Sequence, residues 1–176
     1  MAKQANDMLS NNMITADQLA ANANAAWGPG DIQLGELQPR LSLNESYARY
    51  VEALEEWPYE LGANGPTAYD CSSTVLYGMR HTTGNYNLGD YTADDIFNKF
   101  TTQASWGERG DLLFYDWNSD AKIDHVTTIL GGGKMLHPSS SSNILKIVQT
   151  SKPNSWYPNK SVFIRRINWG SLTKKR

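Results

Sequence analysis

The sequence has little cysteine and little histidine: one cysteine, Cys71, and three histidines in 176 residues. A single cysteine cannot form a disulfide within the chain, so the fold does not depend on an oxidising compartment. One cysteine with scattered histidines also lacks the ligand spacing of a zinc site. The sequence therefore predicts neither a disulfide-stabilised fold nor a metal centre, and it indicates no cofactor.

The chain also lacks an excess of positive charge and any long apolar segment. Its net charge is -2, and 19% of its residues are charged, so a nucleic-acid-binding protein is not expected. The basic residues Arg165-Arg166 and 174–176 lie near the C-terminus, where we expect a solvated end. No apolar run approaches the roughly 20 residues of a membrane-spanning helix, and the first residues show no hydrophobic segment of a secretion signal.

The pattern of the chain predicts an N-terminal helical arm and linker over residues 1–40 and one α+β domain over residues 41–176. Helices are expected over 44–57, from Asp70 or Cys71 to about Gly84, and over 92–100, because apolar residues recur at helical spacing behind capping residues. After residue 110, short segments rich in β-branched and aromatic residues predict an antiparallel sheet of five to six strands. These segments cover residues 111–117, 124–130, 134–139, 144–150 and 161–167.

The stretch "AYDCSSTVLYGMRH" (68–81) contains the only cysteine. A lone cysteine is usually a small buried hydrophobic residue. Cys71, however, opens a predicted helix, where the dipole and the free N–H groups favour a thiolate and can lower the pKa of the thiol below about 8.5. Cys71 is therefore a candidate nucleophile.

Two of the three histidines fall on predicted neighbouring strands. His125 opens one strand and His137 lies on the next, after the turn Gly131-Gly132-Gly133. Antiparallel strands can place such side chains together, so that one imidazole accepts the thiol proton and the other orients the first. His81 ends the helix of Cys71, where compensation of the helix dipole is the expected role.

The acidic residues between the first two of these strands have only a partial likeness to a calcium loop. Asp116, Asp120 and Asp124 follow a suggestive spacing, but Ala121 and Thr127 occupy positions where glycine and glutamate are required. We therefore expect a polar hairpin loop without a metal ion.

Four motifs in order resemble the NlpC family of papain-like peptidases that cut cell-wall peptides. "WPYELG" (57–62) resembles the family's Pro-Tyr-x-x-Gly stretch, and "YDCSS" (69–73) resembles its Asp-Cys-Ser-Gly nucleophile motif. "ERGDLLFY" (108–115) and "DHVTTILGGGKMLHPS" (124–139) resemble its Pro-Gly-Asp-Leu-x-Phe strand and its His-Val-Gly-Ile hairpin with a second histidine. The resemblance covers roughly residues 44 to 150 and implies a papain-like fold, with helices packed on an antiparallel sheet.

The resemblance also implies roles for single residues. Cys71 would be the nucleophile, His125 the general base and His137 the group that orients His125. The residues implied in substrate binding are Tyr59, Asp70 and Ser72. The chain departs from the family pattern at Ser73, where glycine is usual, at Arg109, where proline is usual, and at Thr127, where glycine is common, and these departures bear on substrate preference.

The function implied is a cysteine peptidase that cleaves bacterial peptidoglycan within the stem peptide, between γ-D-glutamate and a diamino acid, through a thioester intermediate. The alternatives are an N-acetylmuramoyl-L-alanine amidase of the related CHAP type and a non-catalytic wall-binding module. An extracellular or virion-associated enzyme is expected, and no signal peptide is visible. A phage lysin, a tail enzyme whose N-terminal arm joins it to a larger assembly, an excised domain of a larger secreted enzyme and an injected antibacterial effector all fit, and no sequence feature decides among them.

Overall fold

The computed structural model describes residues 41–149 and 161–173. The chain divides into two units, Met1–Leu41 and Ser42–Arg176, and the fold below is that of the second. The predicted N-terminal arm lies outside the described residues, as does the basic C-terminal end at 174–176. The proposed domain boundary at residues 40–41 therefore stays a prediction.

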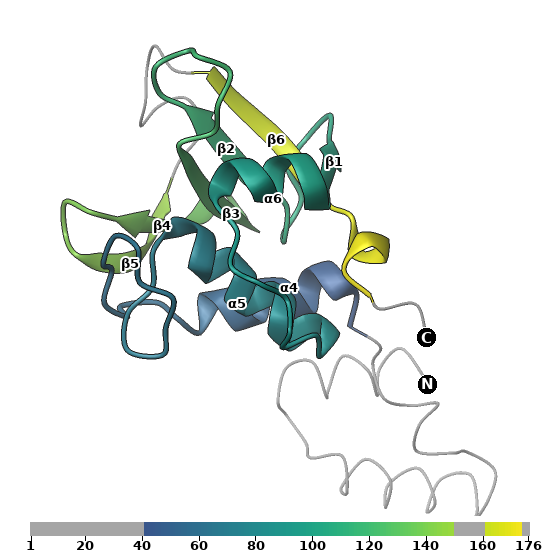
Figure 1. The fold of residues 1–176 in the computed structure, drawn as a ribbon, viewed down its shortest axis with the longest axis horizontal. Helices are drawn as coiled ribbons and strands as arrows, with labels where there is room; N and C mark the ends of the chain where they lie inside the picture. The colour runs from purple at the N-terminus through teal and green to yellow at the C-terminus, as the bar shows by residue number, and fades with distance from the viewer. Residues whose placement is uncertain (1–40, 150–160, 174–176) are drawn as a thin grey trace, which may run out of the picture. The chain divides into compact units, whose positions relative to one another are not determined.

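In the part of the chain that the structure describes, three α-helices precede the six strands of an antiparallel sheet (Figure 1). The helices are α4 (Leu43–Glu52), α5 (Cys71–Thr83) and α6 (Ala93–Phe100), and a short 3-10 helix, η2 (Trp169–Ser171), follows the last strand. The strands are β1 (Thr101–Gln103), β2 (Leu112–Asp116), β3 (His125–Gly131), β4 (Lys134–Ser139), β5 (Ile144–Gln149) and β6 (Ser161–Ile167). Within the described residues this confirms the predicted α+β class and adds β1, which the sequence reading missed.

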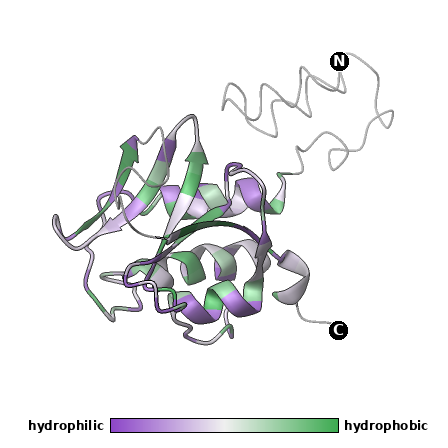
Figure 2. Ribbon diagram, turned by 90° about the horizontal axis from the view of Figure 1, so that it is seen from above, coloured by the Kyte–Doolittle hydropathy of each residue, from purple (hydrophilic) through white to green (hydrophobic). Residues whose placement is uncertain are grey.

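The sheet has the order β1-β6-β2-β3-β4-β5, and the three helices cover one of its faces. Alternating residues of β2 separate the two faces: Leu112 and Phe114 join the core beneath the helices, whereas Leu113 and Tyr115 pack with Met135 on the other side. This is the period of two expected for strands. In Figure 2 the helices show hydrophobic and hydrophilic stretches in alternation, as expected for helices with one buried face.

Helix α4 is shorter than the sequence predicts and begins earlier. Its N-cap is Ser42 rather than Asn44, and it ends at Glu52 rather than at Trp57. Beyond the helix, the N–H of Glu56 donates to the carbonyl of Leu145 at 2.7 Å, so the chain leaves the helix to pair with β5. The side chains of Tyr50 and Trp57, which belong to the helical apolar pattern of residues 44–57, are 38% and 40% exposed.

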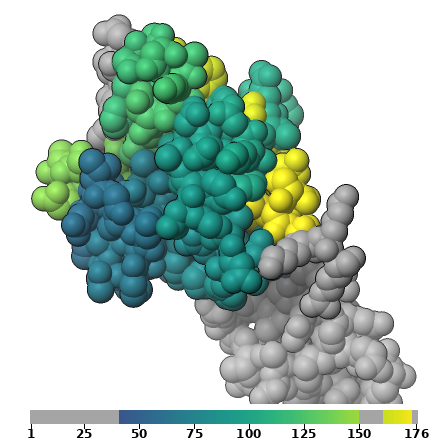
Figure 3. Space-filling model, viewed as in Figure 1, coloured from purple at the N-terminus to yellow at the C-terminus, as the bar shows by residue number. Residues whose placement is uncertain are grey.

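The segment after α4 runs along the outer edge of the sheet. Pro58 forms a β-bridge with Ile144, and the N–H of Tyr59 donates to the carbonyl of Asn143 at 2.8 Å. The space-filling view shows this contact as the blue surface of the α4–α5 connection lying against the light-green β4–β5 hairpin (Figure 3). The connection to the nucleophile helix is thus anchored on the sheet.

The basic pair Arg165-Arg166 is not a solvated end, contrary to the sequence expectation. Both residues lie in β6, and Arg166 donates two hydrogen bonds to the fully buried carboxylate of Asp111, at 3.0 and 2.8 Å. The guanidinium of Arg165 lies over the ring of Phe97, 4.3 Å from its centroid. These cations hold β6 to β2 and α6, because a buried carboxylate needs a charged partner.

Candidate active site

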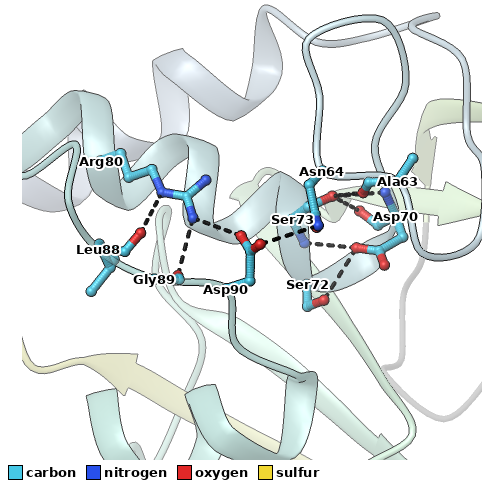
Figure 4. Close-up of polar contacts among 9 residues, drawn as sticks. All are labelled: Ala63, Asn64, Asp70, Ser72, Ser73, Arg80, Leu88, Gly89 and Asp90. Atoms are coloured by element: carbon cyan, nitrogen blue, oxygen red, sulfur yellow. Dashed lines mark hydrogen bonds and ion pairs between the residues drawn. The ribbon is translucent and has the colours of Figure 1, made fainter.

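The start of α5 is built by the residues around Cys71. Asp70 is the N-cap: its carboxylate accepts the N–H of Ser73 at 2.8 Å, and the hydroxyl of Ser73 accepts the N–H of Asp70 at 2.8 Å (Figure 4). This reciprocal capping box defines the first turn. Gly84, in the left-handed conformation, ends the helix, as predicted. Cys71 is consequently the first residue of a helix whose N-terminal N–H groups are available to it.

The Cys71 side chain is buried, 9% exposed, and points toward the beginning of β3. Burial, and after it the charge of Asp70, raises the pKa of the thiol to about 11, while N–H groups of Val126, Ser72 and Cys71 itself act in the opposite direction. The expectation of a lowered pKa at the helix start is therefore wrong, because desolvation outweighs the helix terminus. The interaction with Val126 places the thiol beside the residue that follows His125.

The two strand histidines lie against each other. The β3–β4 register pairs Thr128 with Leu136, and its continuation sets His137 opposite Thr127, so that His125, two residues earlier, is a diagonal neighbour on the same face. The ring centroids of His125 and His137 are 5.2 Å apart, with the planes at 50°. The hairpin therefore brings together the two histidines that the sequence singled out.

Burial sets the protonation of both rings. His125 is 4% exposed, and burial, followed by the neighbouring His137, lowers its pKa to about 3. Burial and then the charge of Lys146, which pairs with His137 across β4 and β5, lower the pKa of His137. At neutral pH both imidazoles are uncharged, and His125 can accept a proton.

Two aromatic side chains also pack against His125. Tyr115 lies opposite His125 in the β2–β3 register, with ring centroids 5.6 Å apart. Trp117 stacks on the imidazole at 5.3 Å, with an interplanar angle of 27°. The sequence reading missed Trp117, although its spacing of two from Tyr115 places it on the same face of the β2 segment.

The three predicted substrate-binding residues border the helix start. Tyr59 forms a β-bridge with Tyr69, the residue before the N-cap. The carboxylate of Asp70 accepts hydrogen bonds from the hydroxyl of Ser72 at 3.1 Å and from the N–H of Gly62 at 3.2 Å, besides its capping bond. Asp70 and Ser72 thus flank Cys71 in the chain, Tyr59 pairs with the segment just before it, and Asp70 holds the local backbone. Their contact with a substrate stays a prediction.

The three departures from the family pattern have structural partners. The buried hydroxyl of Ser73 donates to the carbonyl of Ala63 at 2.7 Å (Figure 4). Arg109 forms ion pairs with Glu45 at 2.8 Å and Glu52 at 2.7 Å. The hydroxyl of Thr127 lies 3.4 Å from that of Tyr115, on the face of the sheet away from the helices. The predicted bearing on substrate preference receives no support from these contacts, which link parts of the scaffold.

The remaining candidates lie outside this cluster. His81 is in the last turn of α5, where its Nδ1 donates to the carbonyl of Tyr77 at 2.9 Å. In the loop between β2 and β3, Asp116 accepts the N–H of Ala121 at 3.0 Å, and Asp124 accepts that of Trp117 at 2.8 Å. Over residues 41–149 and 161–173, no group of three or more His, Cys, Asp or Glu side chains could hold a metal ion.

None of the helices in the described ranges has the length and apolar character needed to cross a lipid bilayer.

Known proteins share this fold and part of this sequence. Probable endopeptidase p60 of Listeria grayi is 33% identical over 91 residues, which are 51% of this chain and 17% of that protein. The P60 domain of antigen MAP1204 from M. avium subspecies paratuberculosis is 26% identical and has a TM-score of 0.55, over 72% of this chain and 95% of that one. The NlpC/p60 domain of the peptidoglycan hydrolase SagA, 24% identical over 69% of this chain and 97% of that one, shares the fold with a TM-score of 0.53.

The matched region contains the whole candidate site. The chain spans 17% or less of the length of the curated relatives it matches. The model of the NlpC/P60 family matches residues 56–166, which include Cys71, His125 and His137. The chain belongs to the NlpC/P60 family of cell-wall peptidases.

Proposed function

We propose that this chain is a cysteine peptidase that hydrolyses the bond between γ-D-glutamate and the following diamino acid in bacterial peptidoglycan stem peptides. The observation that carries the proposal is the arrangement at the start of β3, where the N–H of Val126 interacts with the thiol of Cys71 and the preceding residue, His125, packs against His137. Similarity to proteins named probable endopeptidase p60 supports cleavage within a peptide, and the choice of bond follows the family resemblance of the sequence.

Acylation would begin from a neutral thiol and a neutral imidazole. The pKa values of Cys71 and His125, raised to about 11 and lowered to about 3, both favour the uncharged forms at neutral pH. His125 takes the thiol proton as the sulfur attacks the peptide carbonyl, so general-base catalysis accompanies formation of the C–S bond. The resulting imidazolium gives its proton to the departing amine as the C–N bond breaks, which leaves a thioester on Cys71.

Hydrolysis of the thioester would return the enzyme to its starting state. His125 accepts a proton from water, the oxygen attacks the thioester carbonyl, and the C–S bond breaks. The sulfur recovers its proton from His125, and the product carries a free carboxylate. His137 acts through His125, which it contacts at 5.2 Å between ring centroids, by holding that ring in one orientation.

The start of α5 would stabilise the negative charge that develops on the carbonyl oxygen. The backbone N–H groups of Cys71 and Ser72 already interact with the thiol, so a carbonyl attacked by that sulfur lies near them. Loss of one such donor typically costs about 10²–10³ in rate. Tyr59, Asp70 and Ser72 would bind the peptide.

Two alternatives to an endopeptidase remain: an amidase, which cuts a different bond, and a wall-binding module, which cuts none. A CHAP-like amidase could use the same nucleophile and base on the N-acetylmuramoyl-L-alanine bond, and a wall-binding module would use neither. We place the activity outside the cell, on peptidoglycan. The lysin or tail-enzyme setting stays a prediction from the sequence.

Digestion of purified peptidoglycan followed by mass spectrometry of the muropeptides tests the proposal. The wild-type chain should release fragments with a new N-terminus at the diamino acid, and Cys71→Ala and His125→Gln should release none while keeping the wild-type circular dichroism spectrum. His81→Gln is the matched control, because His81 lies in the last turn of the same helix, away from the site, and should retain activity. Undiminished digestion by Cys71→Ala would refute the mechanism, and fragments that begin with L-Ala would indicate the amidase.

A further inference from the structure

The imidazole of His125 is enclosed by aromatic rings as well as by protein backbone. Besides His137, the rings of Tyr115 and Trp117 lie 5.6 and 5.3 Å from it, centroid to centroid. Of these, Trp117 is nearest to parallel with the imidazole, at 27°, against 42° for Tyr115 and 50° for His137. Trp117 therefore covers a flat face of the ring.

Trp117 also separates His125 from solvent. The indole is 37% exposed, whereas the imidazole against which it stacks is 4% exposed. One side of the indole consequently meets water and the other meets the proposed base. The residues that follow it in the loop, 118 to 122, are all exposed.

The loop that carries Trp117 is braced at several points. The N–H of Trp117 donates to the carboxylate of Asp124 at 2.8 Å, and Asp124 directly precedes His125. The carboxylate of Asp116 accepts the N–H of Ala121 at 3.0 Å, and the N–H of Ile123 donates to Asp94 at the start of α6 at 3.0 Å. The indole is thus fixed relative to the strand that presents the imidazole.

We propose that Trp117 is a positioning residue for the proposed reaction: its indole holds the His125 imidazole in one orientation and keeps water from it. This inference rests on the proposed function, in which His125 is the base. Its physical basis is that an imidazole can rotate about its side-chain bonds unless packing restrains it, and small misplacements of a reacting group cost about 10²-fold in rate.

Trp117 also affects the proton affinity of His125. Titratable groups packed against His125 include Tyr115 from β2 and His137 from β4, and burial lowers the pKa of His137 as well. Because burial is the largest cause of the lowered pKa of His125, hydration of the ring after loss of the indole should raise that pKa toward its ordinary value of about 6.5.

Three variants test the proposal: Trp117→Ala, Trp117→Phe and, as the matched control, Trp106→Ala. Trp106 is a second loop tryptophan, 65% exposed, and its indole N–H bonds to Glu108 at 3.2 Å. The readouts are the NMR titration of the His125 ring, assigned with His81→Gln and His137→Gln, and the pH profile of kcat/KM on a soluble stem peptide. The alkylation rate of Cys71 by iodoacetamide gives a third readout that needs no wall substrate.

The proposal predicts that Trp117→Ala raises the titration midpoint of His125 and shifts the acid limb of kcat/KM toward pH 6.5. At pH 7 it should lower kcat/KM by about 10–100-fold, and Trp117→Phe should restore most of the loss. Trp106→Ala should match the wild type. A wild-type titration and rate in Trp117→Ala would overturn the inference, as would equal effects of Trp106→Ala. If Trp117→Ala fails to fold, Trp117→Phe is measured instead. The proposal then predicts a smaller rise in the titration midpoint of His125, and an unchanged midpoint would overturn the inference. Failure of the proposed function shows instead as activity in Cys71→Ala.

Discussion

Replacement of Ser73 by alanine should destabilise the domain by about 1–2 kcal/mol. The Ser73 hydroxyl donates to the carbonyl of Ala63 at 2.7 Å and accepts the N–H of Asp70 at 2.8 Å. Each such bond contributes about 0.5–1.5 kcal/mol net. The N–H of Asp70 also reaches the carbonyl of Ala63 at 3.2 Å, so it keeps one partner in the variant, which limits the loss to the lower part of the summed range.

Restoring the residue usual in the family should be worse than alanine. Ser73→Gly removes the same two bonds and adds about 0.5–1 kcal/mol for glycine in a helix. For a chain of this length, 1 kcal/mol corresponds to about 2–4 °C in Tm. Ser73→Ala should therefore lower Tm by about 2–8 °C, and Ser73→Gly by about 1–4 °C more.

Differential scanning calorimetry and urea unfolding measure these changes, with Ser72→Ala as the control. The hydroxyl of Ser72 donates to the Asp70 carboxylate at 3.1 Å and does not reach Ala63 in this structure, so a smaller loss is expected. Ser73 is 1% exposed, and its variants should keep the wild-type KM. An unchanged Tm together with a changed KM for Ser73→Ala would refute the reasoning, because Ser73 would then contact the substrate.

Two further predictions concern the histidines and the contact between α4 and α5. Burial lowers the pKa values of His125 and His137, so between about pH 3 and 6.5 the unfolded chain binds more protons than the folded one, and the free energy of unfolding falls as the pH drops below about 6.5. Urea unfolding from pH 7 to 4 should show this fall, and the fall should be shallower in His137→Gln. Equal slopes of unfolding free energy against pH in the wild type and His137→Gln would refute the prediction. A Cβ at Gly78 would lie 2.5 Å from the ring of Tyr47, so Gly78→Ala should lower the free energy of unfolding by about 1–3 kcal/mol through overpacking. The control is Gly89→Ala, whose Cβ would have its nearest neighbouring atom at 3.9 Å, and it should leave the free energy of unfolding nearly unchanged. Equal free energies of unfolding for the two variants would contradict this prediction.

The elements that the sequence predicted well are those governed by local interactions. Asp70 and Gly84 bound α5 as N-cap and C-cap, and Thr92 with Asp95 forms the capping box of α6. Each signal lies within a few residues of the element that it limits. The same holds for the hairpin at Gly131, whose positive φ, like that of the two following glycines, makes the tight turn between the strands of the two histidines.

The errors arose where distant residues decide. Helical spacing continues to Trp57, but the backbone beyond Glu52 pairs with β5, which lies about ninety residues later in the chain. Arg166 was predicted to lie at a solvated basic end, but it bonds to the buried carboxylate of Asp111, which is 55 residues away in the sequence. Trp117 became significant only through its contact with His125, which depends on the register of two strands. Tertiary packing of this kind has no signature within a short window of sequence.

Cys71 shows how two correct physical effects can give opposite predictions. A helix N-terminus stabilises a negative charge by about 0.3–1 kcal/mol, and by about 2 at most, which is less than about 1.5 pKa units. Desolvation of a buried group can raise a pKa by up to about 3–5 units. With the thiol 9% exposed, burial prevails and the pKa rises. Since burial also keeps His125 neutral, a preformed thiolate–imidazolium pair is disfavoured in the closed site. Under the proposed mechanism, proton transfer must accompany attack, and the helix start acts on the oxyanion rather than on the resting thiol.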